Sequence, residues 1–421
     1  MKRFPPVLAL AVLLAAAAGR LPGQSYQTFR DEFEAIRSKS GLQLGPLKVL
    51  TTLKIADFGY DSNILYRPRE EGAVSDTVAT LSPEIKTFWL VGNFVILSFT
   101  ENPEYDFYFH ETALRTLTNS AVPAARVLLF RGLALSADYH VLNELRQATS
   151  EFEEPVRNTQ DGWNARIFFE TPRGSAVGFS GSSDEFRFSN PSIPDPAQDY
   201  ARTLDRRETS VAFEAYYRVF SQSSLFATAG LKDYVFMNPA STWRNGYSRQ
   251  VYGGIRFPLL GQVRGTIAVG YKTFVPRAAG MKEFSGLVAA TDASFREGRF
   301  GLNVAYTRDN YFSYIDTAYY FIEDRFRGSL LFYVFRFLRL EGGWQSGTWR
   351  YPEPYEASVD GQPIIIDNRR DQDHIFSAGL TVRLSGTTGL GVSYNFYQRR
   401  STAPGFDIDR NFIGATLVYD F

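Results

Sequence analysis

Residues 411–421 read NFIGATLVYDF, and their side chains alternate between two characters. Ile413, Leu417 and Tyr419 make one face apolar, whereas the other face is small, polar or mixed. A period of two is that of a β-strand, whose successive side chains point to opposite sides. Such an apolar face would be an adhesive edge on a water-soluble protein, but it is typical of a lipid-facing strand in a membrane barrel. We therefore predict a transmembrane strand whose last aromatic residues, Tyr419 and Phe421, form a C-terminal barrel-assembly signal.

The N-terminus has the layout of a secretory signal. Lys2 and Arg3 precede an apolar run at 7–18, which opens onto glycine and proline. The run is shorter than the roughly 20 residues that a helix needs to span a bilayer. We therefore expect a signal peptide at 1–23, a short periplasmic helical segment at 24–45 and an outer-membrane β-barrel at 46–421.

The predicted helical segment is amphipathic. Phe29, Phe33 and Ile36 recur at helical spacing among charged residues, and Gly41 ends the pattern. The sequence leaves four alternatives open for this segment. It lies in the periplasm, packs against the barrel mouth, plugs the barrel, or is a partly ordered terminal segment.

Composition narrows the class of protein. The chain has 36 Phe and 24 Tyr, yet its mean hydropathy is only −0.21, as expected when half of each strand faces lipid and half faces water. The absence of cysteine excludes disulfides, thiol chemistry and a lipidated cysteine. Charge is balanced at 45 basic and 45 acidic residues, and loss of the signal leaves 42 against 45. This balance excludes a strongly basic nucleic-acid binder.

Short and long connections alternate between the predicted strands. Tight turns fall at 91–93, 131–132, 173–174, 221–223, 261–262, 297–298 and 385–387, and near Arg336. Longer polar connections fall between them, at 66–75, 146–160, 190–205, 238–245, 351–370 and 401–409. An outer-membrane barrel has all its turns on one side and all its loops on the other. We predict an all-β, antiparallel up-and-down transmembrane barrel of about 18 strands (16–18), with both termini periplasmic. Proline at 103 and 123 makes the pattern weakest there and suggests a bulge or an early strand end.

The face opposite the apolar one carries charges on several predicted strands. Charged residues inside a barrel set its selectivity, and the basic excess from residue 218 onward favours anions or polyhydroxylated solutes. A salt-bridge network across the strands would explain the same residues without a role in selectivity. The predicted pore-lining residues are Arg218, Arg256, Arg264, Lys272, Arg327, Arg339 and Arg383, with Glu214 and Glu341 as counter-charges.

Little in the sequence points to catalysis. Of the three histidines, His140 has Ser136 and Asn143 nearby, but Ser136 is four residues away on the same strand, about 13 Å along it. A catalytic serine must reach its histidine by a hydrogen bond, so we predict no enzyme and no catalytic residue.

Acidic clusters at 371–374 and 407–409 contain oxygen ligands suited to calcium, yet they lack a calcium-loop spacing. We predict no metal and no cofactor.

A motif in the first third suggests a family. Residues 59–63 read GYDSN at the end of the first predicted strand, and a polar loop leads to SDTV at 75–78 and LSPEI at 81–85. This arrangement resembles the β-barrel porin 2 family and related outer-membrane β-barrel proteins associated with exopolysaccharide loci. The resemblance implies an outer-membrane barrel and, for some relatives, polysaccharide export or import. Asp61 and Asn63 are also common turn residues that bond their own backbone.

Three classes of function remain in order of preference. The first is an outer-membrane, porin-like channel for small hydrophilic solutes or one associated with exopolysaccharide export. The others are an occluded structural or surface-interaction barrel and an outer-membrane hydrolase. The expected partners are outer-membrane lipid, lipopolysaccharide, the barrel-assembly machinery and polysaccharide or small solutes, with no nucleic acid; the oligomeric state is open.

Overall fold

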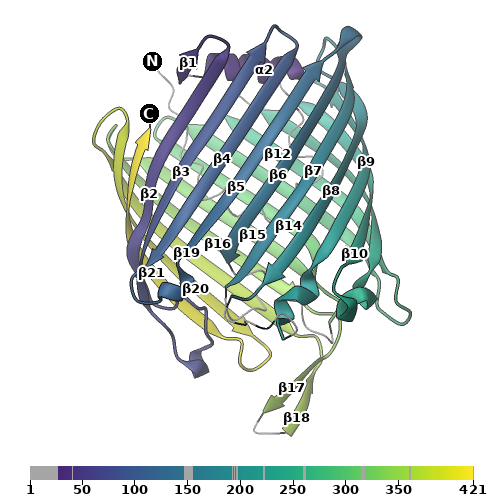
Figure 1. Cartoon of the computed structure of the whole chain (residues 1–421), viewed down its shortest axis with the longest axis vertical. Helices are drawn as coiled ribbons and strands as arrows, with labels where there is room; N and C mark the ends of the chain where they lie inside the picture. The colour runs from purple at the N-terminus through teal and green to yellow at the C-terminus, as the bar shows by residue number, and fades with distance from the viewer. Residues whose placement is uncertain are drawn as a thin grey trace.

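The chain forms a closed antiparallel β-barrel in a computed structural model (Figure 1). The structure describes residues 27–39, 41–146, 155–191, 193, 195, 198–220, 223–258, 262–313, 318–359 and 362–420. Its main sheet has 19 strands, of which the short β1 pairs only with β2. The other 18, β2–β16 and β19–β21, pair in chain order, and β21 pairs back onto β2. The predicted all-β barrel of about 18 strands is thus confirmed, while the predicted signal at 1–23 and Phe421 lie outside the described residues.

The strands of the wall are mostly 13 to 16 residues long, enough for a tilted strand to cross a bilayer. They are β2 Leu47–Asp61, β3 Asp76–Val91, β4 Val95–Tyr108, β5 Thr116–Leu128, β6 Leu133–Arg146, β7 Val156–Glu170, β8 Ala176–Ser189, β9 Arg206–Arg218, β10 Ser224–Phe236, β11 Gly246–Pro258, β12 Val263–Pro276, β13 Phe284–Glu297, β14 Phe300–Phe312, β15 Tyr320–Tyr333, β16 Leu338–Arg350, β19 Arg370–Arg383, β20 Thr388–Ser401 and β21 Ile408–Asp420.

The remaining elements are short. They are the helix α2 Phe29–Ser38, the strand β1 Leu42–Leu44, the hairpin β17 Tyr355–Val359 and β18 Gln362–Ile366, and the 3-10 helices η1 Arg69–Glu71, η2 Thr112–Leu114, η3 Phe130–Gly132, η4 Tyr200–Leu204 and η5 Pro239–Arg244. None of the helices among the described residues has both the length and the apolar character needed to cross a bilayer.

The two faces of each strand differ as the alternation predicts. On β9, Val211, Phe213 and Tyr217 are 42–67% exposed, while Glu208 and Tyr216 on the opposite face are each 6% exposed. Exposed apolar residues of this kind recur on the same outward face of strands around the barrel. Burial of such a belt in hydrocarbon is favourable, at about 25 cal/mol per Å², and a closed wall leaves no unpaired strand edge in lipid. The structure is therefore that of an outer-membrane β-barrel.

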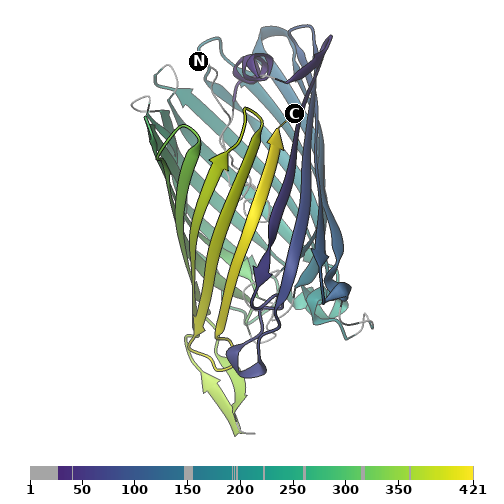
Figure 2. The same ribbon diagram turned by 90° about the vertical axis from the view of Figure 1, so that its left-hand side faces the viewer.

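The first and last described residues, Gln27 and Asp420, lie on one side of the barrel, together with the short turns (Figures 1 and 2). We call this the turn side; connections there include residues 92–94 between β3 and β4 and 171–175 between β7 and β8. Gly132 and Gly174 in two of these turns have φ of +84° and +86°, a conformation that favours glycine. The opposite loop side bears the longer connections, among them residues 62–75, and the β17–β18 hairpin extends beyond the barrel there (Figure 1). The predicted alternation of turns and loops is confirmed.

The seam between the first and last strands is tightly built. Arg410 on β21 donates from Nε to both Asp61 carboxylate oxygens on β2, at 3.0 and 2.8 Å. Gly59 faces the backbone of Ile413, whose carbonyl oxygen would lie 2.1 Å from an added Cβ. Asp61 also accepts a hydrogen bond from the Asn63 backbone N–H, so the motif acts as a turn former as well as a tie across the seam.

Irregularity occurs at a position other than the two predicted. Pro103 and Pro123 stay within β4 and β5, and the ladder between these two strands is continuous. The ladders to β3 and to β6 are interrupted at the prolines, but the register is the same on both sides of each gap. The prolines therefore mark neither a bulge nor a strand end, because proline removes one N–H donor without displacing the chain. The register shift lies instead between Ile55 and Phe58 on β2, where it reverses which residues face outward.

The loops of the loop side are fixed by buried polar contacts. Asp205, between η4 and β9, accepts a hydrogen bond from the Phe188 backbone N–H at 2.6 Å, and its own carbonyl accepts one from Met237. Burial raises the pKa of the Asp205 carboxyl from 3.8 to about 6.

Protonation of Asp205 should therefore stabilise this loop. Because the pKa is higher in the folded loop than in an unfolded chain, stability rises as pH falls through 6 and levels off near the ordinary value. We expect hydrogen exchange at residues 199–205, corrected for its intrinsic pH dependence, to slow roughly tenfold between pH 7 and 4. Asp205→Asn should keep the acceptor and remove this dependence; an equal slowing in that variant would assign it to another group.

Candidate functional site: the barrel lumen

All nine predicted pore-lining residues lie on the inner face of the wall. Side chains alternate between the two faces of a strand, and we call residues on the same face residues of the same parity. Each of the nine has the parity of the buried residues of its strand and not that of the exposed apolar residues. On β12, for example, Lys272 is buried whereas its neighbour Tyr271 is exposed on the outer face. Glu214 and Arg218 are on β9, Arg256 on β11, Arg264 and Lys272 on β12, Arg327 on β15, Arg339 and Glu341 on β16, and Arg383 on β19. Their role in conduction stays a prediction.

The structure does not bring these nine residues together as one group. Lys272 pairs with Asp309 at 2.8 Å, and Arg339 pairs with Glu341 at 2.8 Å. Arg218 reaches Asp31 of α2 at 2.7 Å. Glu214 accepts hydrogen bonds from Ser180 and Tyr216, and Arg383 donates to the carbonyls of Ser385 and Gly386 in its own turn. Part of the set therefore belongs to a structural network, as the alternative explanation expected.

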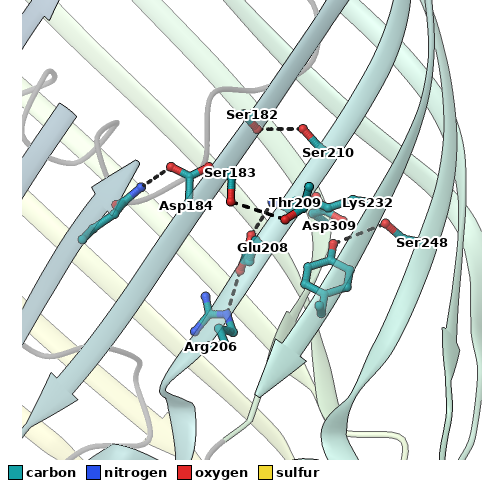
Figure 3. A network of polar contacts seen from close by, with 12 residues as sticks. Ser182, Ser183, Asp184, Arg206, Glu208, Thr209, Ser210, Lys232, Ser248 and Asp309 are labelled. Carbon is teal, nitrogen blue, oxygen red and sulfur yellow. Dashed lines mark hydrogen bonds and ion pairs between the residues drawn. The ribbon is translucent and has the colours of Figure 1, made fainter. Parts of the chain in front are cut away.

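On the loop side the inner charges are closely paired. Glu208 on β9 lies between Arg206 Nε, at 2.7 Å, and Lys232 on β10 (Figure 3). Next to it, Asp184 on β8 accepts from Gln160 at 3.1 Å. Because neighbouring strands supply opposite charges, this part of the wall is electrically neutral over short distances and is cross-linked between strands.

Aromatic side chains pack within the loop side of the lumen. Phe274 on β12 and Tyr319, which precedes β15, stack with ring centroids 5.2 Å apart, and both are almost fully buried. Phe312 meets Phe274 and Tyr234 edge to face at 5.6 and 5.1 Å. Tyr319 also donates to the backbone carbonyl of Arg244 in η5, which ties the end of one loop to another. Aromatic contacts of this kind contribute about 0.5–1.5 kcal/mol each beyond area burial, so these loops form a fixed packing that narrows the lumen.

Toward the turn side, three inner arginines differ from the paired charges. Among the described residues, Arg166 on β7, Arg264 on β12 and Arg327 on β15 have no carboxylate within ion-pair distance. These three guanidinium groups on the turn-side half of the inner wall therefore lack, within the described part of the chain, a carboxylate close enough to neutralise them, in contrast to the paired charges of the loop side.

The helix α2 lies at the turn-side mouth of the barrel (Figures 1 and 2). Phe29, Phe33 and Ile36 form its buried face and pack with Ile96 on β4; Phe88, Leu90 and Leu128 from the inner wall surround this cluster. The predicted helix and its apolar face are confirmed, and its place is the barrel mouth rather than free in the periplasm.

The ends of α2 are held by opposite charges on the barrel wall. The Phe29 backbone N–H donates to both oxygens of Glu170 on β7, at 3.0 Å each. At the other end, Lys48 Nζ on β2 donates to the carbonyls of Ile36, Arg37 and Lys39, at 3.0, 2.8 and 2.6 Å. A carboxylate at a helix N-terminus and an ammonium at its C-terminus both favour the helix dipole. The helix is thus fixed across the mouth.

Side chains along α2 add ion pairs to the wall. Arg126 on β5 contacts both Glu32 and Glu170, and Arg218 contacts Asp31. The helix is therefore tied to β2, β5, β7 and β9, which lie apart along the wall. Sequence reasoning predicted the helix but missed Lys48, Glu170 and Arg126; Lys48 and Arg126 share the parity of other inward residues, which was the available signal.

The weaker chemical candidates have other partners. His140 Nε2 bonds Asp184 at 2.6 Å and lies 3.3 Å from Gln160, so its bonds among the described residues are to a carboxylate and an amide rather than to Ser136. Asp371 accepts from Arg369, Arg399 and Ser401. Asp409 pairs with Arg400 and Arg69. Asp371 and Asp409, one in each acidic cluster, are therefore engaged by guanidinium groups.

No family model matches the chain, and no curated protein matches its sequence. Its structure resembles Pseudomonas aeruginosa OccK3, at 13% identity over 89% of this chain and 95% of that chain, with a TM-score of 0.47. It resembles a BenF-like porin from Pseudomonas fluorescens, at 12% identity over 90% and 99%, with a TM-score of 0.48. It also resembles the FrpB iron transporter from Neisseria meningitidis, at 12% identity over 86% of this chain and 63% of that chain, with a TM-score of 0.47.

Proposed function

We propose that the protein is an outer-membrane channel for small hydrophilic solutes, with both termini in the periplasm and a weak preference for anions or polyhydroxylated solutes. The observation that carries the proposal is the contrast inside the lumen. Charges on the loop side neutralise one another, whereas Arg166, Arg264 and Arg327 on the turn side have no acidic partner among the described residues. Uncompensated charges on a pore wall raise the local concentration of ions of opposite sign.

Reversal potentials in a salt gradient test the preference. Arg264→Gln and Arg327→Gln should each lower the anion-to-cation permeability ratio by a factor on the order of two, because each removes one uncompensated charge from the path. Arg207→Gln is the matched control. Arg207 lies on the same outward face of β9 as Val211 and pairs with Glu185 outside the lumen. Cation preference in the wild-type channel, or equal effects of all three variants, would refute the proposed path.

An occluded barrel is the second candidate, and the aromatic packing around Phe274 and Tyr319 favours it. Single-channel recording in planar bilayers separates the two. Discrete conductance steps support an open lumen, and silence from folded, inserted protein supports occlusion.

Association with exopolysaccharide export is the narrower cargo hypothesis that follows from the resemblance of residues 59–63 and 75–85. A glycan in the lumen would reduce ionic current as it enters. Dose-dependent current block by neutral oligosaccharides, without block by polyethylene glycol of equal size, would support a glycan path over general solute passage.

A further inference from the structure

Three arginines gather on the outward face of the wall at its loop side. Arg308 on β14 has the parity of the exposed Leu302, Arg350 on β16 that of Trp344, and Arg370 on β19 that of Phe376. They therefore point away from the lumen, and this cluster plays no part in the channel lining.

One carboxylate, that of Asp324, pairs with two arginines of this cluster. Asp324 on β15, whose side chain is only 15% exposed, accepts from Arg308 Nη1 at 2.9 and 3.0 Å, and it also pairs with Arg350. Tyr306 donates its hydroxyl to the same carboxylate at 2.6 Å. The oxygens of Asp324 are thereby occupied, and its single charge cannot balance three guanidinium groups.

The remaining positive charge is held in an unfavourable register. Arg350 and Arg370 are direct cross-strand partners, and like charges in that position repel. Arg370 is exposed, and among the described residues its side chain has no carboxylate within ion-pair distance. An anion bound between the two guanidinium groups would remove this repulsion.

The cluster lies at the height expected of lipid headgroups. Phe326 and Trp344, an aromatic pair with centroids 5.2 Å apart, precede it on the membrane side of β15 and β16. Aromatic side chains mark the edge of the hydrocarbon region. Asp324 is two residues beyond Phe326, about 7 Å further along the strand, where a phosphate attached to an acyl-bearing sugar would lie.

A smaller version of the arrangement occurs on β8 and β9. Glu185 is shared there by Arg187 and Arg207, the latter at 2.9 Å, and both arginines are more than half exposed. This pair also shares the outward parity of Phe179 and Val211. Two guanidinium groups around one carboxylate again leave one positive charge facing the lipid phase.

We infer that Arg350 and Arg370, steadied by Arg308 and Asp324, form a binding site for a phosphorylated glycolipid of the outer leaflet. Guanidinium groups bind phosphate oxygens through paired, charge-assisted hydrogen bonds, and the acyl chains would cover the apolar wall around Phe326 and Trp344. The inference rests on the proposed orientation, with the loop side outward, and does not depend on whether the lumen conducts.

Native mass spectrometry of the full-length barrel in detergent, titrated with diphosphorylated lipid A, tests the site. We expect the wild type to retain one tightly bound lipid A and the Arg350→Gln/Arg370→Gln variant to bind at least about tenfold more weakly. Lipid A stripped of both phosphates should bind wild type as weakly as it binds the variant. Excess inorganic phosphate should compete poorly, because it lacks the acyl chains.

The control variant is Arg166→Gln/Arg264→Gln, which removes the same charge from the inner wall and should leave lipid A binding unchanged. Heat-modifiable migration on gels confirms that each variant is folded. Arg350→Lys/Arg370→Lys, which keeps the charge but not the paired donors, should bind with intermediate affinity. Wild-type affinity in the glutamine variant, or an equal loss in the control, would overturn the inference, and strong competition by inorganic phosphate would reassign the site to free anions.

Discussion

Lys48→Met should release α2 from the barrel mouth and raise single-channel conductance on the order of twofold, since a helix about 10 Å across leaves the opening. Lys48 Nζ donates to three terminal carbonyls of the helix, and methionine can donate to none. Loss of these charge-assisted bonds should weaken helix docking by roughly 3 kcal/mol. Planar-bilayer recording measures the conductance, and trypsin cleavage near Arg30 and Arg37 reports whether the helix has become accessible.

The matched control for this prediction is Lys54→Met. Lys54 is six residues further along β2, and it has the same inward parity before the bulge. The Lys54→Met substitution removes an equal charge from the same inner face but removes no contact with α2. Conductance should therefore change little, and the helix should stay protected from trypsin. Glu170→Gln at the other end of the helix should act in the same direction as Lys48→Met, because it weakens the acceptor for the Phe29 N–H. Unchanged conductance together with full protection of α2 in Lys48→Met would mean that the hydrophobic contacts alone hold the helix.

Val269→Arg should lower the free energy of unfolding in liposomes by about 2–4 kcal/mol, because it places a charge on the lipid face near the middle of a strand. Val269 is the seventh residue of β12 and is 52% exposed on the outward face. Urea titration, followed by the heat-modifiable shift on gels, measures the change, and the yield of folded barrel should fall with it.

Thr266→Arg is the control on the opposite face of the same strand. Thr266 has Asp292 on β13 and Arg256 on β11 as its two cross-strand partners, so an arginine there meets one charge of each sign in the lumen. We expect its effect to stay within about 1 kcal/mol. If the two variants were equally destabilised, the outward face would not be in contact with hydrocarbon.

The side of the wall on which each charge lies could be predicted from the sequence, but its partner could not. Arg264 and Arg339 were both predicted as inward charges, yet Arg339 pairs with Glu341 on its own strand while Arg264 has no acidic partner among the described residues. Parity along a strand is local, whereas pairing depends on side-chain conformation and on which strands lie alongside. The prolines show the same limit: their chemistry is evident in the sequence, but only the ladders show that the register passes through Pro103 and Pro123 unchanged.

The sequence by itself determined the class of fold, the approximate number of strands and the inward and outward faces, because period-two alternation and turn spacing are properties of neighbouring residues. Only the tertiary structure decided where α2 lies, since Lys48 and Glu170 reach its two ends from strands more than one hundred residues apart in the chain. It likewise brought Tyr319 onto Phe274 through loop packing and aligned Arg350 with Arg370 through the register between β16 and β19. Those long-range contacts are set by the three-dimensional path of the chain, and for that reason no local pattern contains them.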